Sequence, residues 1–451
     1  MKNWIKFSLT SLFLATMLVG FAQEEGTTDD RDLQYFRNPG KKGINIFETP
    51  KDNTVKYTGE KVRLGGNFSM VFQGLDHQTS LDGTELVTLS KNFQLPTANL
   101  NLDVQLQDGL RMHLRTYLSS RNHAESYVKG GYMQMDKLDF ISPGLLSGFM
   151  EKATIRVGMD QFNYGDVQFR RADNAASTYN PFVSNYIMDA FSTEPFLELT
   201  YQTNGWLGVI GVTNGRLNQA PTTGDNGFAY FAKLGFDKQL SDDLRFRLTG
   251  SIYSSSDQGT RDYLYGGDRA GGRYFNIFQV AGTTEDNNFL PRFNPSYPYQ
   301  TSIQFNPFVK YAGLEFFGVY EIIKNGDDNH GNEGGLNTGT GVSNIGGGFN
   351  QVGAELLYRI GAAERFYVGF RYNKVSGEQY DEQAVGGIVN STTWETQEIT
   401  RTNFGLGFFM TDNVLTKFEV VNQKYEGAGW EGTVFQGGKF NGFNIEAVIS
   451  F

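Results

Sequence analysis

The feature that most constrains the fold of this chain is a two-residue alternation of apolar and polar side chains, recurring in segments of about ten residues. The clearest segment runs from Ala98 to Gln107 and is followed by Asp108-Gly109 and a second alternating segment. Asp-Gly between two such segments is a strong signal for a β-hairpin. Each strand of this kind has one apolar face and one polar face.

Sixteen candidate strands emerge when the whole chain is searched for this alternation. They cover residues 61–73, 97–107, 110–120, 126–137, 153–161, 194–203, 206–213, 226–237, 243–254, 303–311, 314–323, 349–360, 365–375, 399–410, 414–425 and 440–451. The sequence therefore predicts an all-β fold.

The connections between these strands alternate between short and long. In one set every connection is a tight turn, except for residues 138–152, which form a longer connection. The other set is mostly long and polar and covers residues 74–96, 162–193, 255–302, 324–348, 376–398 and 426–439. Outer-membrane barrels have short periplasmic turns and long extracellular loops, whereas a soluble β-sandwich has no reason to sort its loops in this way. We therefore expect a transmembrane antiparallel β-barrel of about 16 strands.

The N-terminal residues indicate export. A basic start, an apolar run ending at Phe21 and the small residue Ala22 predict a signal peptide over residues 1–22. The apolar run is shorter than the roughly 20 residues of a membrane-spanning helix. The chain has no cysteine, which excludes disulfides and a lipid-modified cysteine. We expect residues 23–60 to form a polar periplasmic lead-in that need not be ordered, and residues 61–451 to form the barrel.

The last nine residues alternate as a strand and end on an aromatic residue. The apolar set is Phe443, Ile445, Ala447, Ile449 and Phe451. This segment resembles the C-terminal strand of bacterial outer-membrane barrels, in which the final aromatic residue is read by the barrel-insertion machinery. The resemblance implies that these five residues form an insertion signal. It also implies residence in the outer membrane, in contact with its lipid and lipopolysaccharide.

Sixteen strands enclose a lumen too wide for side chains alone to fill. The charged and aromatic loop at residues 162–193 is similar, in strand order and composition, to the constriction loop of sixteen-stranded general and phosphate-selective porins. The resemblance is architectural and covers the barrel, but no residue-level selectivity motif matches, and the lysine clusters of the phosphate-selective members cannot be aligned. It implies an inward-folded loop and a water-filled pore for small hydrophilic solutes or ions. By analogy with porins, it also implies a homotrimer.

Charged residues face the lumen when the apolar set is placed outward, because charges facing lipid are costly. The candidate pore-lining and constriction residues are Arg63, Asp103, Arg111, His113, Arg115, Arg156, Asp166, Arg170, Arg171 and Asp173. Further inward charges are Asp160, Arg245, Arg247, Glu315, Glu321, Glu355, Arg371, Glu419 and Glu446. Arginines concentrate on the early strands and glutamates on the late ones, which predicts a field across the pore that orders small polar solutes. The alternative is that these charges form solvated ion-pair ladders.

Two other classes of function remain open. A barrel enzyme would need a nucleophile beside an imidazole, and no serine lies near His113 at a defensible spacing, so we expect no enzyme. Residues 327–333 could collect calcium through oxygen ligands but lack the EF-hand spacing, so no metal or cofactor is expected. An accessory barrel that plugs its own lumen and joins a larger outer-membrane assembly is the main alternative to a pore. Its loops at residues 255–302 and 324–348 would bind a partner or cap the pore. No nucleic-acid partner is expected.

Overall fold

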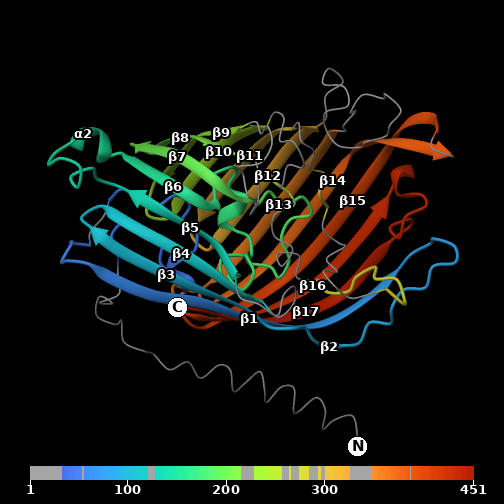
Figure 1. The fold of residues 1–451 in the computed structure, drawn as a ribbon. Helices are drawn as coiled ribbons and strands as arrows, with labels where there is room; N and C mark the ends of the chain where they lie inside the picture. The colour runs from blue at the N-terminus through green and yellow to red at the C-terminus, as the bar shows by residue number, and fades with distance from the viewer. Residues whose placement is uncertain are drawn as a thin grey trace, which may run out of the picture. The chain divides into compact units, whose positions relative to one another are not determined.

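The strands form a single antiparallel sheet that closes on itself (Figure 1). This computed structural model describes residues 33–52, 55–119, 127–214, 228–255, 264–265, 274–283, 293–295, 300–325, 348–385 and 388–451. The predicted signal peptide and the candidate calcium loop at residues 327–333 lie outside the described residues. The described part of the chain has seventeen strands, of which β2 has only two residues. Sixteen longer strands remain, and the predicted fold class is confirmed.

The strands follow one another around the barrel in chain order. They are β1 (Lys61–Gln78), β2 (Asn92–Phe93), β3 (Thr97–Gln107), β4 (Leu110–Ser119), β5 (Tyr127–Met135), β6 (Ala153–Gln161), β7 (Thr193–Thr203), β8 (Trp206–Thr213), β9 (Ala229–Gln239), β10 (Leu244–Ser255), β11 (Gln300–Tyr311), β12 (Leu314–Asn325), β13 (Gly348–Ile360), β14 (Phe366–Val385), β15 (Ile388–Thr411), β16 (Val414–Glu426) and β17 (Lys439–Ser450). The helical elements are short: η1 (Gly40–Gly43), α2 (Ser147–Met150), η2 (Val167–Phe169) and η4 (Ala428–Trp430). No helix in the described ranges has the length and hydropathy needed to cross a bilayer.

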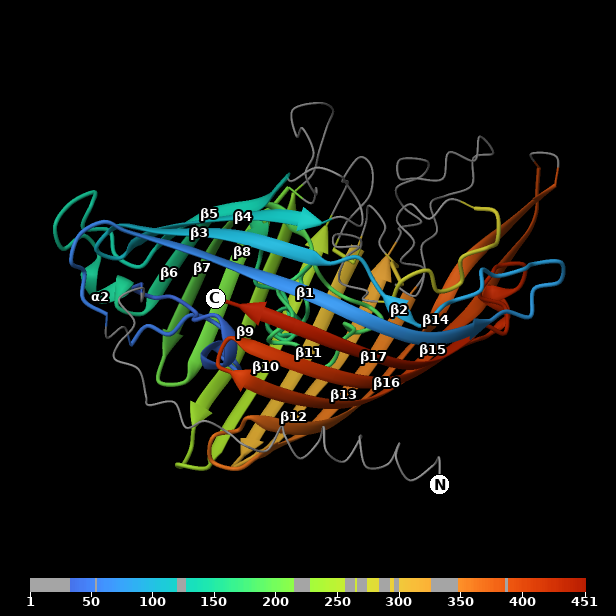
Figure 2. The same cartoon turned by 90° about the horizontal axis from the view of Figure 1, so that it is seen from below.

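The barrel closes between its first and last strands (Figure 2). β1 pairs with β17 on one side and with β3 on the other, so the sheet leaves no open edge. Phe451 extends this closure, because its backbone N–H donates to the Gly66 carbonyl oxygen at 3.0 Å and its carbonyl accepts from the Gly66 N–H at 2.9 Å. Ile445, Ile449 and Phe451 are exposed on the outer face.

The two faces of the barrel differ in polarity. On β13, Gln351, Glu355 and Arg359 are buried inside the barrel, whereas Leu356 and Ile360 are exposed outside. Large apolar side chains are exposed in this way on the outer face of strands all around the barrel. Such a continuous apolar surface is unfavourable in water and favourable in lipid. The barrel therefore spans a membrane.

The largest difference from the predicted strands lies at residues 376–398, which we expected to be a polar loop. β14 and β15 instead remain paired up to Val385 and Ile388. Both strands thus continue about ten residues farther than the alternation indicated. The reason is that this segment contains β-branched residues and no proline, so a hairpin is favourable there even where its faces differ little in polarity.

Candidate functional site: the lumen and its inner loop

The connection between β6 and β7 lies inside the barrel, where nearly every residue of it is buried. We call residues 162–193 the inner loop; Figure 1 draws it in green within the sheet. Its backbone N–H groups donate to wall side chains: Val183 to Glu419 at 2.9 Å, and Ile187 to Asn373 at 2.7 Å. A buried loop needs partners for its backbone polar groups, and the barrel wall provides them.

A second segment, residues 33–52, also lies inside the barrel, on the side of the short turns. We call it the lumen strap. The Gly109 N–H donates to Gln34 Oε1 at 2.9 Å, and Lys51 Nζ lies 2.9 Å from Asp136 Oδ1. Phe47 is buried and its ring centroid lies 5.3 Å from that of Phe308. The polar composition of residues 23–60 gave no indication of these contacts, although Phe47 in a polar segment is a sequence signal for burial.

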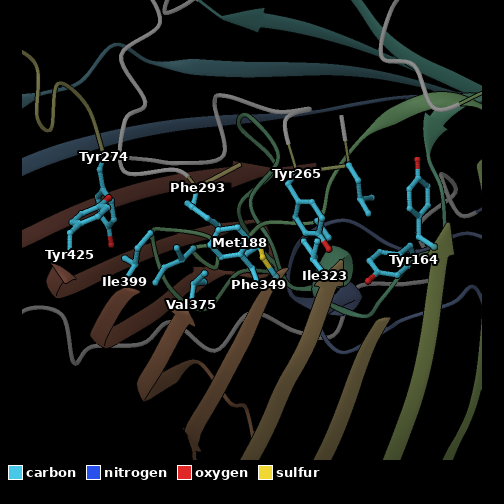
Figure 3. Close-up of a cluster of buried hydrophobic side chains, with 14 of the residues drawn as sticks. Tyr164, Met188, Tyr265, Tyr274, Phe293, Ile323, Phe349, Val375, Ile399 and Tyr425 are labelled. Carbon is cyan, nitrogen blue, oxygen red and sulfur yellow. The ribbon is translucent and has the colours of Figure 1, made fainter. Parts of the chain in front are cut away.

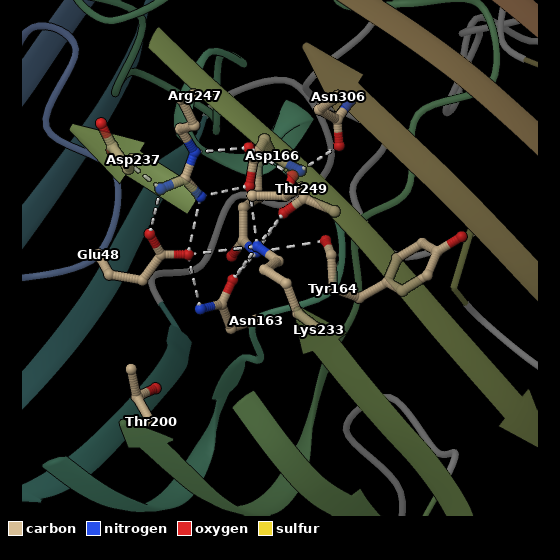
Figure 4. A network of polar contacts seen from close by, with 12 residues as sticks. Glu48, Asn163, Tyr164, Asp166, Thr200, Lys233, Asp237, Arg247, Thr249 and Asn306 are labelled. Atoms are coloured by element: carbon tan, nitrogen blue, oxygen red, sulfur yellow. Dashed lines mark hydrogen bonds and ion pairs between the residues drawn. The ribbon is translucent and has the colours of Figure 1, made fainter. Parts of the chain in front are cut away.

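The inner loop and the lumen strap meet β9 and β10 in a buried ion-pair network (Figure 4). Asp166 of the inner loop accepts two hydrogen bonds from Arg247, at 2.7 and 2.8 Å, and lies 2.9 Å from Lys233 Nζ. Glu48 of the strap lies 2.7 Å from Arg247 Nη1 and 3.4 Å from Lys233 Nζ. Thr249 Oγ1 donates to Asp166 at 2.8 Å. The carboxylates of Asp166 and Glu48 and the cations of Arg247 and Lys233 thus join the inner loop, the lumen strap and the β9–β10 hairpin.

Acid is expected to loosen this network only at low pH. Burial would raise the pKa of Asp166, but Arg247 and Lys233 outweigh it and hold that pKa well below its ordinary value of 3.8. A carboxyl whose pKa is lowered in the docked state stabilises that state at every pH above its ordinary pKa. This stabilisation is lost as the pH falls through the lowered pKa. The effect of Asp166→Asn on ion conductance in planar bilayers should therefore stay the same from neutral pH down to about pH 4, and diminish only at lower pH, where Asp166 becomes protonated. Equal conductance of Asp166→Asn and the unmodified protein between pH 7 and pH 5 would contradict this role of Asp166.

The predicted residues of the early strands form a cluster around Asp103. Its carboxylate lies 2.8 Å from His113 Nδ1, 3.4 Å from Arg111 Nη1 and 4.0 Å from Arg63 Nη1. The other ring nitrogen of His113 lies 3.3 Å from Arg115 Nη2. Both nitrogens of this imidazole therefore have polar partners within the cluster.

Arg115 and Arg156 are the most exposed of the six arginines predicted to line or constrict the pore. Arg115 lies 2.9 Å from Asp173 of the inner loop, and Arg156 lies 2.8 Å from Glu198. Their side chains remain 21% and 20% exposed, against 3% for Arg170. These two guanidinium groups are paired, and about a fifth of each side chain is not covered by protein.

The remaining charges of the inner loop are turned toward other partners. Arg170 lies 3.0 Å from Glu355 on β13, and Arg171 forms two hydrogen bonds, at 2.9 and 2.7 Å, with Asp189 within the loop. Asp166 faces β10 rather than the arginines of the early strands. The structure thus brings Asp173 to the early wall, with Arg171 Nη1 3.8 Å from its carboxylate, and places Asp166 and Arg170 elsewhere.

Sequence reasoning missed several charged residues of the lumen. They are Glu48, Lys233, Arg359, Arg401 and Lys417. Arg359 pairs with Glu315, and Lys417 lies 2.6 Å from Glu446. Arg359 shares its side of β13 with Glu355, so the same alternation could have identified it. With these cations, the late wall is more evenly charged than the sequence indicated.

On the side of the long loops, the lumen contains a cluster of buried apolar side chains (Figure 3). Met188 of the inner loop packs here with Phe349 and Val375 of the wall. Further loops also contribute to this cluster, and those residues include Tyr265, Tyr274 and Phe293. The inner loop is consequently held by ion pairs on one side and by an apolar core on the other.

No protein family and no curated protein matches this chain in sequence. Its fold resembles solved structures of outer-membrane proteins. They include the outer membrane channel DcaP of Acinetobacter baumannii (12% identity, covering 88% of this chain and 99% of that chain, TM-score 0.49). An anion-selective porin from Comamonas acidovorans gives 10% identity, coverage of 87% and 100%, and a TM-score of 0.48. OmpF of Salmonella typhi, in a complex with daunomycin, has 10% sequence identity, covers 87% of this chain and 98% of that chain, and gives a TM-score of 0.46. These likenesses carry no conclusion about solute or selectivity.

Proposed function

We propose that the barrel conducts small hydrophilic solutes or ions by passive diffusion, through a water-filled passage between the inner loop and the wall of β4, β5 and β6. The observation that carries this proposal is the partial exposure of Arg115 and Arg156 inside the barrel. Charged side chains that reach water within a membrane barrel are typical of a pore lining.

The cavities around the lumen strap support a route on this side. One cavity of about 150 Å³ is lined by Arg156, Tyr132, Gln168 and Arg37. Two larger cavities, of about 560 and 720 Å³, border the strap at the short-turn end of the barrel. Polar amides, guanidinium groups and an aromatic ring around a small cavity suit solutes that form hydrogen bonds. We infer a non-catalytic role, and a homotrimer stays a prediction that crosslinking can test.

A plugged accessory barrel is the second candidate function. The packing of the inner loop, the lumen strap and the apolar cluster inside one barrel favours it, because each of them reduces the space left for solutes. Single-channel recordings on the purified full chain in planar bilayers separate the two functions. Discrete conductance steps would support the pore, and their absence over a correctly folded barrel would support the accessory subunit.

The selectivity of the pore should depend on Arg115 and Arg156. We expect Arg115→Glu and Arg156→Glu each to shift the reversal potential toward cation preference. A charge that faces a narrow passage acts on ions within a Debye length of about 8 Å at physiological salt. The measurement is the reversal potential in a salt gradient across a planar bilayer.

Lys374→Glu is the matched control for these variants. Lys374 is ion-paired with Glu398, and its strand places it on the outer face of the barrel. Reversing the charge of Lys374 should leave the ion selectivity of the pore unchanged. Identical selectivity in all three variants would place the solute route away from β4 and β6.

A further inference from the structure

The turn between β5 and β6 differs from the other short turns of the barrel. Residues 138–152, which we call the apolar foot, form a compact structure that includes α2. The Ile141 N–H donates to the Leu138 carbonyl oxygen at 2.9 Å, and the Met150 N–H donates to the Leu146 carbonyl oxygen at 2.9 Å. The Gly144 N–H donates to Asp139 Oδ1 at 2.6 Å. The foot is therefore an ordered element rather than a loose connection.

One side of the apolar foot packs on the outer face of the barrel. Leu138 and Met150 are buried and pack with Ile155, Leu199 and Tyr201. These three strand residues alternate with Thr154, Arg156, Glu198 and Thr200, which line the lumen, so they face the lipid side. The ring of Phe149 lies 5.6 Å from that of Tyr201. The foot thus folds outward over the lipid-facing surface and not across the mouth of the pore.

The other side of the foot presents apolar side chains to its surroundings. Phe140, Ile141, Leu146 and Phe149 are 37%, 64%, 59% and 40% exposed. Single exposed apolar residues are ordinary, but four within ten residues of one ordered element form a patch. A patch of this kind marks a contact with another apolar phase or molecule.

We propose that the apolar foot inserts into the periplasmic leaflet of the outer membrane and contacts phospholipid at the level where headgroups meet acyl chains. Its exposed side chains continue the lipid-facing surface of β5, β6 and β7 through Leu199 and Tyr201. Residues 138–152 carry two acids and one lysine, so the foot has a net charge of −1. Apolar burial rather than attraction to anionic lipid would therefore hold it, and a zwitterionic bilayer suffices. This inference is independent of what the pore conducts.

The absence of cysteine makes a labelling experiment direct. Ile141→Cys is labelled with an environment-sensitive fluorophore, and the protein is folded into phosphatidylcholine vesicles. Ala362→Cys, in the exposed turn between β13 and β14, is the matched control. Both positions are exposed, so the substitutions should leave the barrel intact, which heat-modifiable migration on a gel verifies.

We expect the label at Ile141 to emit at shorter wavelength than the label at Ala362. It should be quenched several-fold more by lipids that carry a quencher on the acyl chain, and less by iodide in solution. Equal quenching by iodide at the two positions would overturn the proposal. Protection from both quenchers would also overturn it, because it would show that a protein surface, such as a second copy of this chain, covers the foot.

Discussion

Replacing Phe451 with aspartate is expected to reduce the amount of folded protein in the outer membrane by about tenfold or more. Transfer of a phenylalanine side chain out of water contributes about 1.5–3 kcal/mol, and each 1.4 kcal/mol corresponds to about a factor of ten. Phe451 is exposed on the outer face, and its backbone pairs with Gly66 where the barrel closes. A charge there would weaken both the predicted insertion signal and the last contact between β17 and β1.

The measurement is a heat-modifiability assay on isolated outer membranes. Phe451→Tyr should retain the terminal aromatic residue and preserve the protein level. Ile360→Asp is the matched control, because Ile360 is also exposed on the outer face, at the end of β13, but is not terminal. A smaller effect of Ile360→Asp would identify the loss at Phe451 as specific to the terminus. Normal levels of folded protein with Phe451→Asp would contradict the insertion signal.

The barrel itself could be predicted because lipid and water impose a two-residue period on every spanning strand. On β3, the alternation from Ala98 to Gln107 was sufficient to locate the strand and the turn at Gly109. Gly109 has a φ of +72°, which a glycine adopts without strain. Where a strand continues without a polarity difference, as in β14 beyond Val375, the pattern ends before the strand does.

The contents of the lumen could not be predicted in the same way. The lumen strap has no period, and its Glu48 meets Arg247, which is 199 residues away in the sequence. The path of the inner loop depends on partners spread over β10 to β16, such as Gln351 for Met188 and Glu419 for Val183. Composition indicated that the loop is charged, but pairing depends on which strand each charge reaches in space.

The Asp166 network is the most direct test of the inner loop as the constriction. In Asp166→Asn, Arg247 and Lys233 lose a fully buried carboxylate that each of them contacts. Removing one partner of a buried ion pair costs about 3–5 kcal/mol where it leaves a buried charge uncompensated. Glu48 still contacts both cations here, so we expect a cost toward the lower end of that range. We expect the loop to leave its docked position, and the single-channel conductance to rise several-fold. Deletion of residues 166–174 should act in the same direction and more strongly.

Asp108→Asn gives the matched control for this substitution, because it removes an aspartate from an ion pair with Lys137 that is exposed to solvent. Exposed pairs contribute about 0–1 kcal/mol, so conductance should remain that of the unmodified protein. If conductance rises in Asp166→Asn but not in Asp108→Asn, and the barrel stays heat-modifiable, then the docked inner loop is the constriction. If conductance stays unchanged in both Asp166→Asn and the deletion of residues 166–174, then the lumen strap or the apolar cluster on the side of the long loops limits the passage. Met188 and Phe47 would then be the residues to replace, because they anchor those two alternatives inside the barrel.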